Sequence, residues 1–263
     1  MTLTAKELAL GYEDRLVVQG LNLEIRRGEI VSFIGPNGSG KSTILKALAR
    51  TLRARGGAVY LDGRDIQTLP PRQLARRLAF LPQGPQAPAD LTVRELVWHG
   101  RFPHLRWWES ASRADVEAVE TALRQTRLEE LADRPLTALS GGERQRAWIA
   151  LALAQSPSIL LLDEPTTYLD ICHQLEIMEL VSRLNAELGL TVAMVLHDIN
   201  QAARYSHRLV VLHQGRVVAE GPPAGILTEE LLRNVFGVES RIQYDSEGKP
   251  LCLPTGLARF TKV

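Results

Sequence analysis

A glycine-rich segment near the N-terminus constrains the fold of this chain more than any other feature. It reads Gly35-Pro36-Asn37-Gly38-Ser39-Gly40-Lys41-Ser42 and matches the phosphate-loop pattern GxxxxGK[ST]. The apolar run 30–34 precedes it and a helix-patterned segment, 42–51, follows it, so the loop joins a predicted buried strand to a predicted helix. In this context the pattern predicts backbone N–H groups that surround phosphate oxygens, and the alternative of a plain glycine-rich turn is disfavoured.

Carboxylates at the end of a second apolar run extend this prediction. The run 159–162 ends in Asp163 and Glu164. Strand ends in parallel sheets face the ligand crevice, so both side chains are expected near Lys41 and Ser42. Lys41 would pair with the β- and γ-phosphates, while Ser42 and Asp163 would help hold Mg²⁺. Glu164 would position or deprotonate the attacking water.

A third motif is Leu139-Ser140-Gly141-Gly142-Glu143, which precedes the helical run 144–155. A serine and two glycines at a helix start can form an anion-binding nest. The same residues are also compatible with an ordinary capped helix, and spacing alone does not decide between the two.

The remaining sequence alternates strand-like and helix-like segments. Buried-strand runs at 159–163 and 191–197 flank a helix-patterned segment, 172–188, and an Arg/Glu/Ala/Leu-rich helical block occupies about 90–157. The segments 209–212 and 217–219 predict a hairpin, and Thr228 is a candidate cap for a short helix over 228–236. This order favours an α/β core with a mostly parallel sheet.

Taken in order, the phosphate loop, Leu139–Glu143 and Leu160–Glu164 resemble the ATPase subunits of ATP-binding cassette (ABC) transporters. The resemblance covers about residues 2–240. It implies an α/β fold: a RecA-like P-loop NTPase core with an antiparallel β subdomain and an inserted α-helical subdomain at about 88–157. A short C-terminal extension, 241–263, is expected to follow the ATPase domain.

Four further residues match motifs of this family. Tyr12 resembles the aromatic residue that stacks on adenine, and Gln83 resembles the glutamine that joins the helical block to the core and reaches Mg²⁺. Asp170 ends the segment 167–170, which resembles the aspartate loop at the subunit boundary of this family. His197 resembles the histidine that contacts the γ-phosphate. Their plainer interpretations are a strand aromatic, a turn residue, a helix cap and a polar residue at a strand end.

The resemblance thus implies a full set of site residues. Catalysis is expected from Glu164, His197, Gln83 and Lys41, and binding of Mg²⁺ from Ser42, Gln83 and Asp163. Binding of ATP is expected from Tyr12, Gly35, Pro36, Asn37, Gly38, Ser39, Gly40, Lys41, Ser42, Thr43, Ser140, Gly141, Gly142, Glu143 and Asp170.

Partners are also implied by the family. Two cassettes face each other head to tail, so a second copy of this chain is expected, bridged by ATP. No apolar run approaches the ~20 residues of a membrane helix, so two separate membrane permease subunits are expected and, indirectly, an extracytoplasmic substrate-binding protein. The expected location is peripheral, on the cytoplasmic face of the cell membrane. A formal charge of +1 does not favour broad nucleic-acid contact, and no nucleic-acid partner is expected.

Three segments, 100–104, 167–174 and 196–205, bear on which cargo the transporter carries. Together they resemble the ATPases of iron-chelate (ferric siderophore) importers. Haem and cobalamin importers are close relatives, and the ATPase of an exporter with separate membrane subunits is a further alternative. DNA-maintenance ATPases of the superfamily insert coiled coils or zinc modules, and its translation factors carry two cassettes in one chain; neither pattern is present here.

A permease-contact surface is expected near 83–105. The loop 84–88 is proline-rich, and four aromatic residues, Trp98, Phe102, Trp107 and Trp108, follow it. Aromatic side chains often anchor interfaces, although Trp98 also fits a place in the core.

Overall fold

The fold is described from a computed structural model, which covers residues 2–13, 15–88, 90–105 and 111–258. The strands are β1 (Leu3–Tyr12), β2 (Arg15–Ile25), β3 (Ile30–Ile34), β4 (Gly56–Leu61), β5 (Arg64–Asp65), β6 (Leu78–Leu81), β7 (Ile159–Asp163), β8 (Thr191–Val195), β9 (Arg208–His213), β10 (Arg216–Gly221), β11 (Val238–Tyr244) and β12 (Pro250–Leu257). The α-helices are α1 (Lys41–Leu48), α2 (Pro71–Ala75), α3 (Val93–Trp98), α4 (Arg113–Gln125), α5 (Gly141–Ala154), α6 (Ile171–Leu188), α7 (Ile199–Tyr205), α8 (Pro223–Ile226) and α9 (Glu229–Leu231). Short 3₁₀ turns occur at η1 (His99–Arg101), η2 (Glu129–Leu131) and η3 (Leu136–Ala138), and a π-helical turn, η4, spans Leu232–Phe236.

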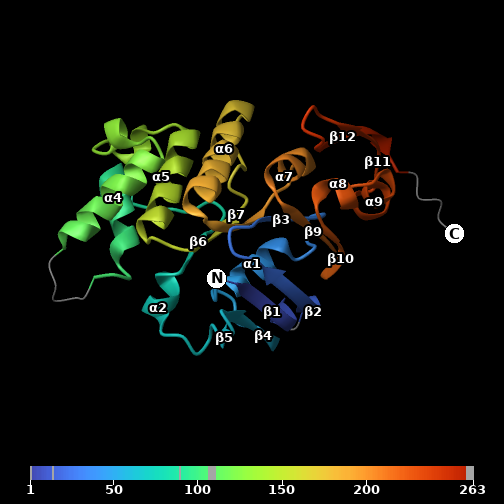
Figure 1. Cartoon of the computed structure of the whole chain (residues 1–263), viewed down its shortest axis with the longest axis horizontal. Coiled ribbons are helices and arrows are strands. Elements are labelled where there is room, and N and C mark those ends of the chain that lie inside the picture. Colours follow the sequence, from blue (N-terminus) through green and yellow to red (C-terminus); the bar gives the residue numbers. More distant parts are fainter. Residues whose placement is uncertain (1, 14, 89, 106–110, 259–263) are drawn as a thin grey trace.

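A six-stranded sheet in the order β10-β9-β3-β8-β7-β6 forms the centre of the molecule (Figure 1). Its neighbours from β9 to β6 pair in parallel, and only the β9–β10 hairpin is antiparallel. The mostly parallel α/β sheet predicted from the sequence is therefore confirmed. Crossover connections through helices account for the parallel order, because parallel strands cannot be joined by a tight turn.

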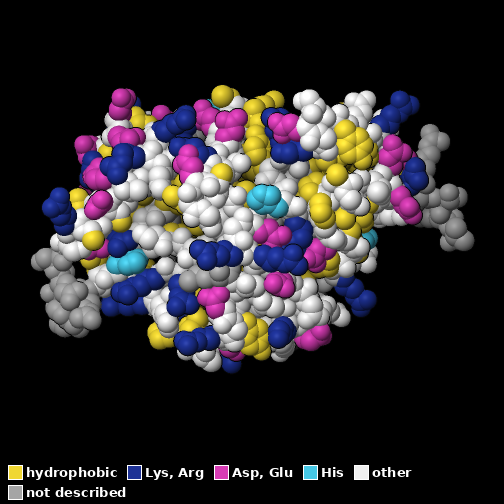
Figure 2. Space-filling view, in the orientation of Figure 1, with side chains coloured by type: hydrophobic (Ala, Val, Ile, Leu, Met, Phe, Trp, Pro, Cys, Tyr) yellow, Lys and Arg dark blue, Asp and Glu magenta, His cyan; other side chains and the backbone are white. Residues whose placement is uncertain are grey.

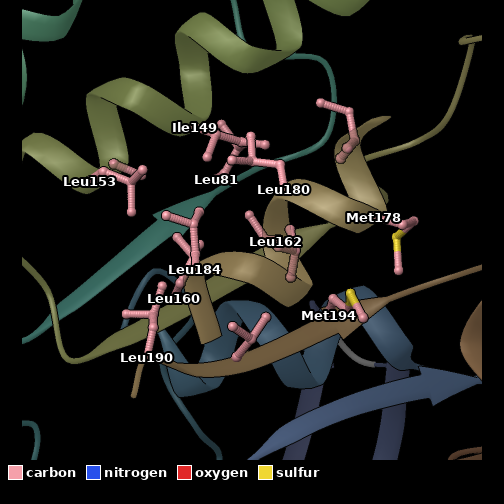
Figure 3. Close-up of a cluster of buried hydrophobic side chains, with 14 of the residues drawn as sticks. Leu81, Ile149, Leu153, Leu160, Leu162, Met178, Leu180, Leu184, Leu190 and Met194 are labelled. Atoms are coloured by element: carbon pink, nitrogen blue, oxygen red, sulfur yellow. The ribbon is translucent and has the colours of Figure 1, made fainter. Parts of the chain in front are cut away.

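Successive residues of the central strands face two different hydrophobic layers. In β7, Leu160 and Leu162 pack with α5 and α6, whereas Ile159 and Leu161 pack on the opposite face with α1 and with strands β1, β2 and β4. This alternation follows from the two-residue period of a strand. Figure 3 shows the layer beneath α5 and α6, where leucines of β6 and β7 meet Ile149 and Leu184. Burial on both faces explains why these strands read as unbroken apolar runs.

A second, antiparallel sheet in the order β2-β1-β4-β5 packs beyond α1. The helical block formed by α3, α4 and α5 lies between β6 and β7 in the sequence and occupies one end of the molecule in Figure 1. The C-terminal hairpin of β11 and β12 lies at the other end, and its first strand already begins at Val238.

Several predicted element boundaries were wrong by one to three residues. The first helix begins at Lys41 and ends at Leu48, because Arg50 adopts a left-handed φ of 60° that a helix cannot continue. Strand β8 ends at Val195, so His197 lies in the loop that follows rather than in the strand. None of the helices in the described part of the chain combines the length and hydropathy needed to cross a membrane.

Candidate functional site

The loop 35–40 turns sharply from β3 into α1, and its glycines are needed for that path. Gly40 precedes the helix with a left-handed φ of 101°, and a Cβ at this position would lie 2.7 Å from Val18 Cγ2. A Cβ on Gly35 would lie 2.1 Å from the carbonyl oxygen of Leu212. No side chain caps the start of α1, so its first N–H groups remain open toward the loop.

The ammonium group of Lys41 lies inside this loop. Its Nζ donates to the carbonyl oxygens of Gly35 at 2.8 Å and Pro36 at 3.0 Å. The side chain is buried, and burial lowers the pKa of Lys41, although the nearby carboxylates of Glu164 and Asp163 oppose this shift. The loop therefore holds one buried positive charge at its centre.

Asp163 lies at the end of β7 beside the first turn of α1. Its Oδ1 accepts a 2.7 Å hydrogen bond from Ser42 Oγ. Asp163 is only 3% exposed, and burial raises the pKa of its carboxyl group despite the hydrogen bond from Ser42. The Ser42 hydroxyl and the buried Asp163 carboxylate thus lie side by side at the edge of the loop, and both are oxygen ligands of the kind that hard cations prefer.

Glu164 is the meeting point of three segments that are distant in the sequence. Its Oε1 lies 2.6 Å from His197 Nε2, and its Oε2 accepts hydrogen bonds from Gln83 Nε2 at 2.7 Å and Thr167 Oγ1 at 3.0 Å. Gln83 follows β6, Glu164 follows β7 and His197 follows β8, and these three strands are neighbours in the sheet. The left-handed φ of 54° at Glu164 is uncommon for a non-glycine residue and turns the chain sharply out of β7.

A cleft of about 1160 Å³ opens over these groups. Of the residues predicted from the sequence, it is lined by Tyr12, Asn37, Gly38, Gly40, Lys41, Ser42, Thr43, Gln83, Glu164 and His197. Gly35, Pro36 and Ser39 belong to the same loop but do not line the cleft, and Ser39 is only 2% exposed. The structure therefore brings the phosphate loop and the strand-end residues together.

Sequence reasoning missed several lining residues. Arg15, Leu16 and Val17 enter from β2, and Thr167, Tyr168 and Gln214 enter from loops. Arg15 pairs with Tyr12 in the antiparallel register of β1 and β2, so recognition of that strand pair would have placed Arg15 beside the predicted aromatic residue. Tyr168 is 94% exposed at a left-handed φ of 67°, and no local pattern signals this conformation.

The signature segment (139–143) lies outside this cleft. Ser140 Oγ accepts from the N–H of Glu143 at 3.2 Å, and Glu143 Oε2 accepts from the N–H of Ser140 at 2.8 Å, forming a capping box at the start of α5. Asp170 also lies outside the cleft and caps α6. Both expected interpretations of the segment, a capped helix and an anion nest, are compatible with this geometry.

The expected contact surface divides into three parts. Trp98 is partly buried and packs against the core, whereas Phe102 is 57% exposed and meets the ring of His99 edge-on. Trp107 and Trp108 lie outside the described residues.

Positive and negative side chains are interspersed over the face of the molecule shown in Figure 2. The near-zero net charge therefore reflects mixed charges on that face and not a large patch of one sign balanced by another elsewhere on it.

Comparison with known proteins agrees with this geometry. The family model described as "ABC transporter" matches residues 18–167. The iron(3+)-hydroxamate import ATP-binding protein FhuC of Bacillus subtilis is 48% identical over 99% of this chain and 97% of its own, and the ferric enterobactin transport ATP-binding protein FepC of Escherichia coli is 46% identical over 97% and 94%. Among solved structures, the dimeric bacterial ABC transporter cassette MJ0796 matches with a TM-score of 0.72 and 33% identity, covering 84% of this chain and 98% of that one.

Proposed function

The chain belongs to the ABC transporter family of ATPases, with the RecA-like P-loop fold, and on that premise we propose that it is the ATP-hydrolysing subunit that powers import of an iron chelate through a separate membrane permease. The relatives named for iron(3+)-hydroxamate import and ferric enterobactin transport match it over nearly its whole length. The observation that carries the ATPase assignment to particular residues is the Glu164 carboxylate, held by Gln83 and His197 at the edge of the phosphate loop.

Binding of ATP follows from the shape and charge of the cleft. The triphosphate lies along 35–43, where the N–H groups at the start of α1 and the ammonium of Lys41 face it. Lys41 already makes hydrogen bonds to two carbonyl oxygens of the loop, and phosphate oxygens are stronger acceptors for the same donors. Tyr12, 46% exposed at the rim of the cleft, stacks on the adenine.

The residues present fit a bound Mg²⁺. The hydroxyl of Ser42 and the carboxylate of Asp163 meet at 2.7 Å. Gln83 uses its Nε2 to bond Glu164, and its amide oxygen has no hydrogen-bond partner among the described residues. The described residues contain no cluster of three His, Cys, Asp or Glu side chains, so the set is one of a few hard oxygens with remaining positions left for water and phosphate. When bound, the cation neutralises charge on the β- and γ-phosphates.

Hydrolysis requires a water in line with the γ-phosphate, and Glu164 is the residue proposed to hold it. Its two oxygens are oriented by separate neighbours, His197 on one and Gln83 with Thr167 on the other. Orientation of this kind is most of what phosphoryl transfer asks of a protein, since positioning and charge stabilisation dominate its catalysis. His197 also contacts the γ-phosphate in this proposal.

A second copy of the chain completes each site. The signature segment and Asp170 do not reach the cleft of their own chain, and a head-to-tail pair would place them over the ATP of the partner. The dimeric cassette MJ0796 supports this arrangement as a structural relative. ATP then contributes affinity for the closed pair, and its hydrolysis removes that contribution.

The remaining partners are two membrane permease subunits and, through them, an extracytoplasmic substrate-binding protein. The chain would dock on the permeases at the cytoplasmic face of the membrane, with the surface around 83–105 and its exposed Phe102 as the contact. The ATPase does not touch the cargo, so haem or cobalamin import is the closest alternative, followed by an exporter with separate membrane subunits.

Uptake of labelled ferric chelates in cells with and without this chain tests the proposal. Wild-type protein should restore uptake, Glu164→Gln should not, and Val116→Ala, an exposed change on α4, should behave as wild type. Parallel measurements with haem and cobalamin separate the alternatives. Unchanged ferric-chelate uptake in the absence of the chain would contradict the proposed cargo while leaving the ATPase activity to be measured on the purified protein.

A further inference from the structure

The first turn of α6 and Leu169, which precedes that helix, pack against the two glycines of the signature segment. A Cβ built on Gly142 would lie 2.1 Å from Cδ2 and 2.6 Å from Cγ of His173, so the imidazole ring lies against the backbone at this position. A Cβ on Gly141 would lie 3.3 Å from Leu169 Cδ2. Gly142 is therefore needed for close packing as well as for an anion nest.

The ring of His173 is held in place by the aspartate loop. Oδ1 of Asp170 lies 2.9 Å from the backbone nitrogen of His173 and 2.8 Å from its ring Nδ1. One carboxylate oxygen therefore caps α6 and also fixes the orientation of the imidazole that covers Gly142. The contact joins Asp170, His173 and Gly142 into one unit.

This unit adjoins the free donors of α5. The capping box engages the N–H groups of Ser140 and Glu143, whereas neither the N–H of Gly141 nor that of Gly142 has a hydrogen-bond acceptor among the described residues. Such unpaired N–H groups in the first turn of a helix are the ones that bind anions. Their location depends on what packs behind them, namely Leu169 and His173.

We propose that His173 is a positioning residue that, held by Asp170, sets the backbone N–H groups of Gly141 and Gly142 for the γ-phosphate of ATP bound by the second copy of the chain. This role rests on the proposed ATP-bridged pair, and His173 is not one of the site residues expected from the sequence. A displacement of Asp170 would shift the imidazole of His173 and, with it, the N–H groups of Gly141 and Gly142. The loop and the signature segment therefore engage the partner together.

The test measures ATP-dependent pairing of the full chain carrying Glu164→Gln, which slows hydrolysis, by analytical ultracentrifugation. Adding His173→Ala should raise the dissociation constant of the pair about tenfold, while ATP affinity of the single chain and its Tm stay close to the parent. His173→Phe retains a ring against Gly142 but loses the bond to Asp170, so it should fall between the two. Cys172→Ala, at the exposed preceding residue, is the matched control and should pair as the parent does.

Activity provides a second readout in the chain with native Glu164. If His173 acts on pairing, the ATPase rate of His173→Ala should be low in dilute protein and recover as protein concentration rises, with KM for ATP unchanged. Parent-like pairing by His173→Ala would overturn this inference alone. A parallel loss of single-chain ATP binding and Tm would also overturn it, by assigning His173 to general folding. Absence of ATP-dependent pairing in the Glu164→Gln parent would overturn the proposed pair itself.

Discussion

Ser42 Oγ donates a 2.7 Å hydrogen bond to Asp163 Oδ1, joining two residues 121 positions apart in the sequence. Ser42 lies in the first turn of α1 and Asp163 ends β7, so the bond closes the phosphate loop onto the central sheet. Asp163 is buried where it makes this contact, and burial raises the pKa of its carboxyl group. Burial therefore makes the negative charge of Asp163 unfavourable in the free protein, and a cation bound beside Ser42 would offset that cost.

Asp163→Asn should separate stability from function. Asparagine can still accept the bond from Ser42 but carries no charge, so we expect a higher Tm at neutral pH, by roughly 2–4 °C for each kcal/mol gained in a chain of this size, and loss of Mg²⁺-dependent hydrolysis. The folded-state pKa of Asp163 is raised, so the native carboxylate lowers stability as pH rises from the unfolded value through the folded one. The Tm advantage of the variant should accordingly shrink as pH falls through the acidic range. Calorimetry across pH measures this, and a Tm difference that grows toward acid would contradict it.

Glu164→Gln should retain ATP binding and nearly abolish hydrolysis. The amide can keep contacts to Gln83 and Thr167 but cannot act as a base, and loss of a general base typically lowers the rate by about 10²–10⁴-fold. Phosphate release at saturating Mg²⁺-ATP measures the rate, and equilibrium binding of ATP serves as the control. Substantial residual turnover in the variant would contradict the role proposed for Glu164.

Glu143→Gln should strengthen ATP-dependent pairing. The carboxylate of Glu143 lies at the start of α5, and hydrogen bonds from Ser140 lower its pKa, so the group stays ionised where the partner's phosphate would approach. Glutamine can keep the capping box without the charge. We expect a dissociation constant lower by roughly threefold at low ionic strength and a smaller difference in high salt, as screening weakens the repulsion. Pairing that is unchanged in low salt would show that the charge does not reach the interface.

Arg101→Met should destabilise the helical block. Arg101 Nε and Nη2 donate to Asp115 Oδ1 at 3.0 and 2.9 Å, and Nη1 donates to the carbonyl oxygen of Ala154 at 2.6 Å, all in a buried setting. Removing the cation leaves the carboxylate of Asp115 buried without its partner, at a cost of about 3–5 kcal/mol. Urea unfolding measures the loss, with exposed Arg113→Met as the control. A loss below about 1 kcal/mol, the size typical of an exposed pair, would show that Asp115 does not depend on Arg101.

The local motifs were readable because each is confined to a few consecutive residues. The apolar runs of β3 and β7 follow from strands buried on both faces, and the glycine pattern of 35–40 follows from backbone conformations that other residues avoid. Element ends were less accurate, as at α1 and β8, because a helix or strand stops where tertiary contacts or a single left-handed residue stop it. The region of the β11–β12 hairpin was expected only as a short C-terminal extension, 241–263, whereas its first strand begins at Val238. The hairpin contacts α7, where the Asn200 side chain bonds both the N–H and the carbonyl oxygen of Cys252, and no local sequence pattern predicts this contact.

By itself, then, the sequence determined the phosphate loop, the paired carboxylates at a strand end and the α/β class, because each depends on neighbours along the chain. The tertiary structure alone decided that Gln83 and His197 both contact the carboxylate of Glu164, since that depends on β6, β7 and β8 being adjacent in the sheet. It also decided that His173 covers Gly142. Strand order and helix packing arise from burying apolar faces that are far apart in sequence, and no spacing within one segment encodes which faces will meet.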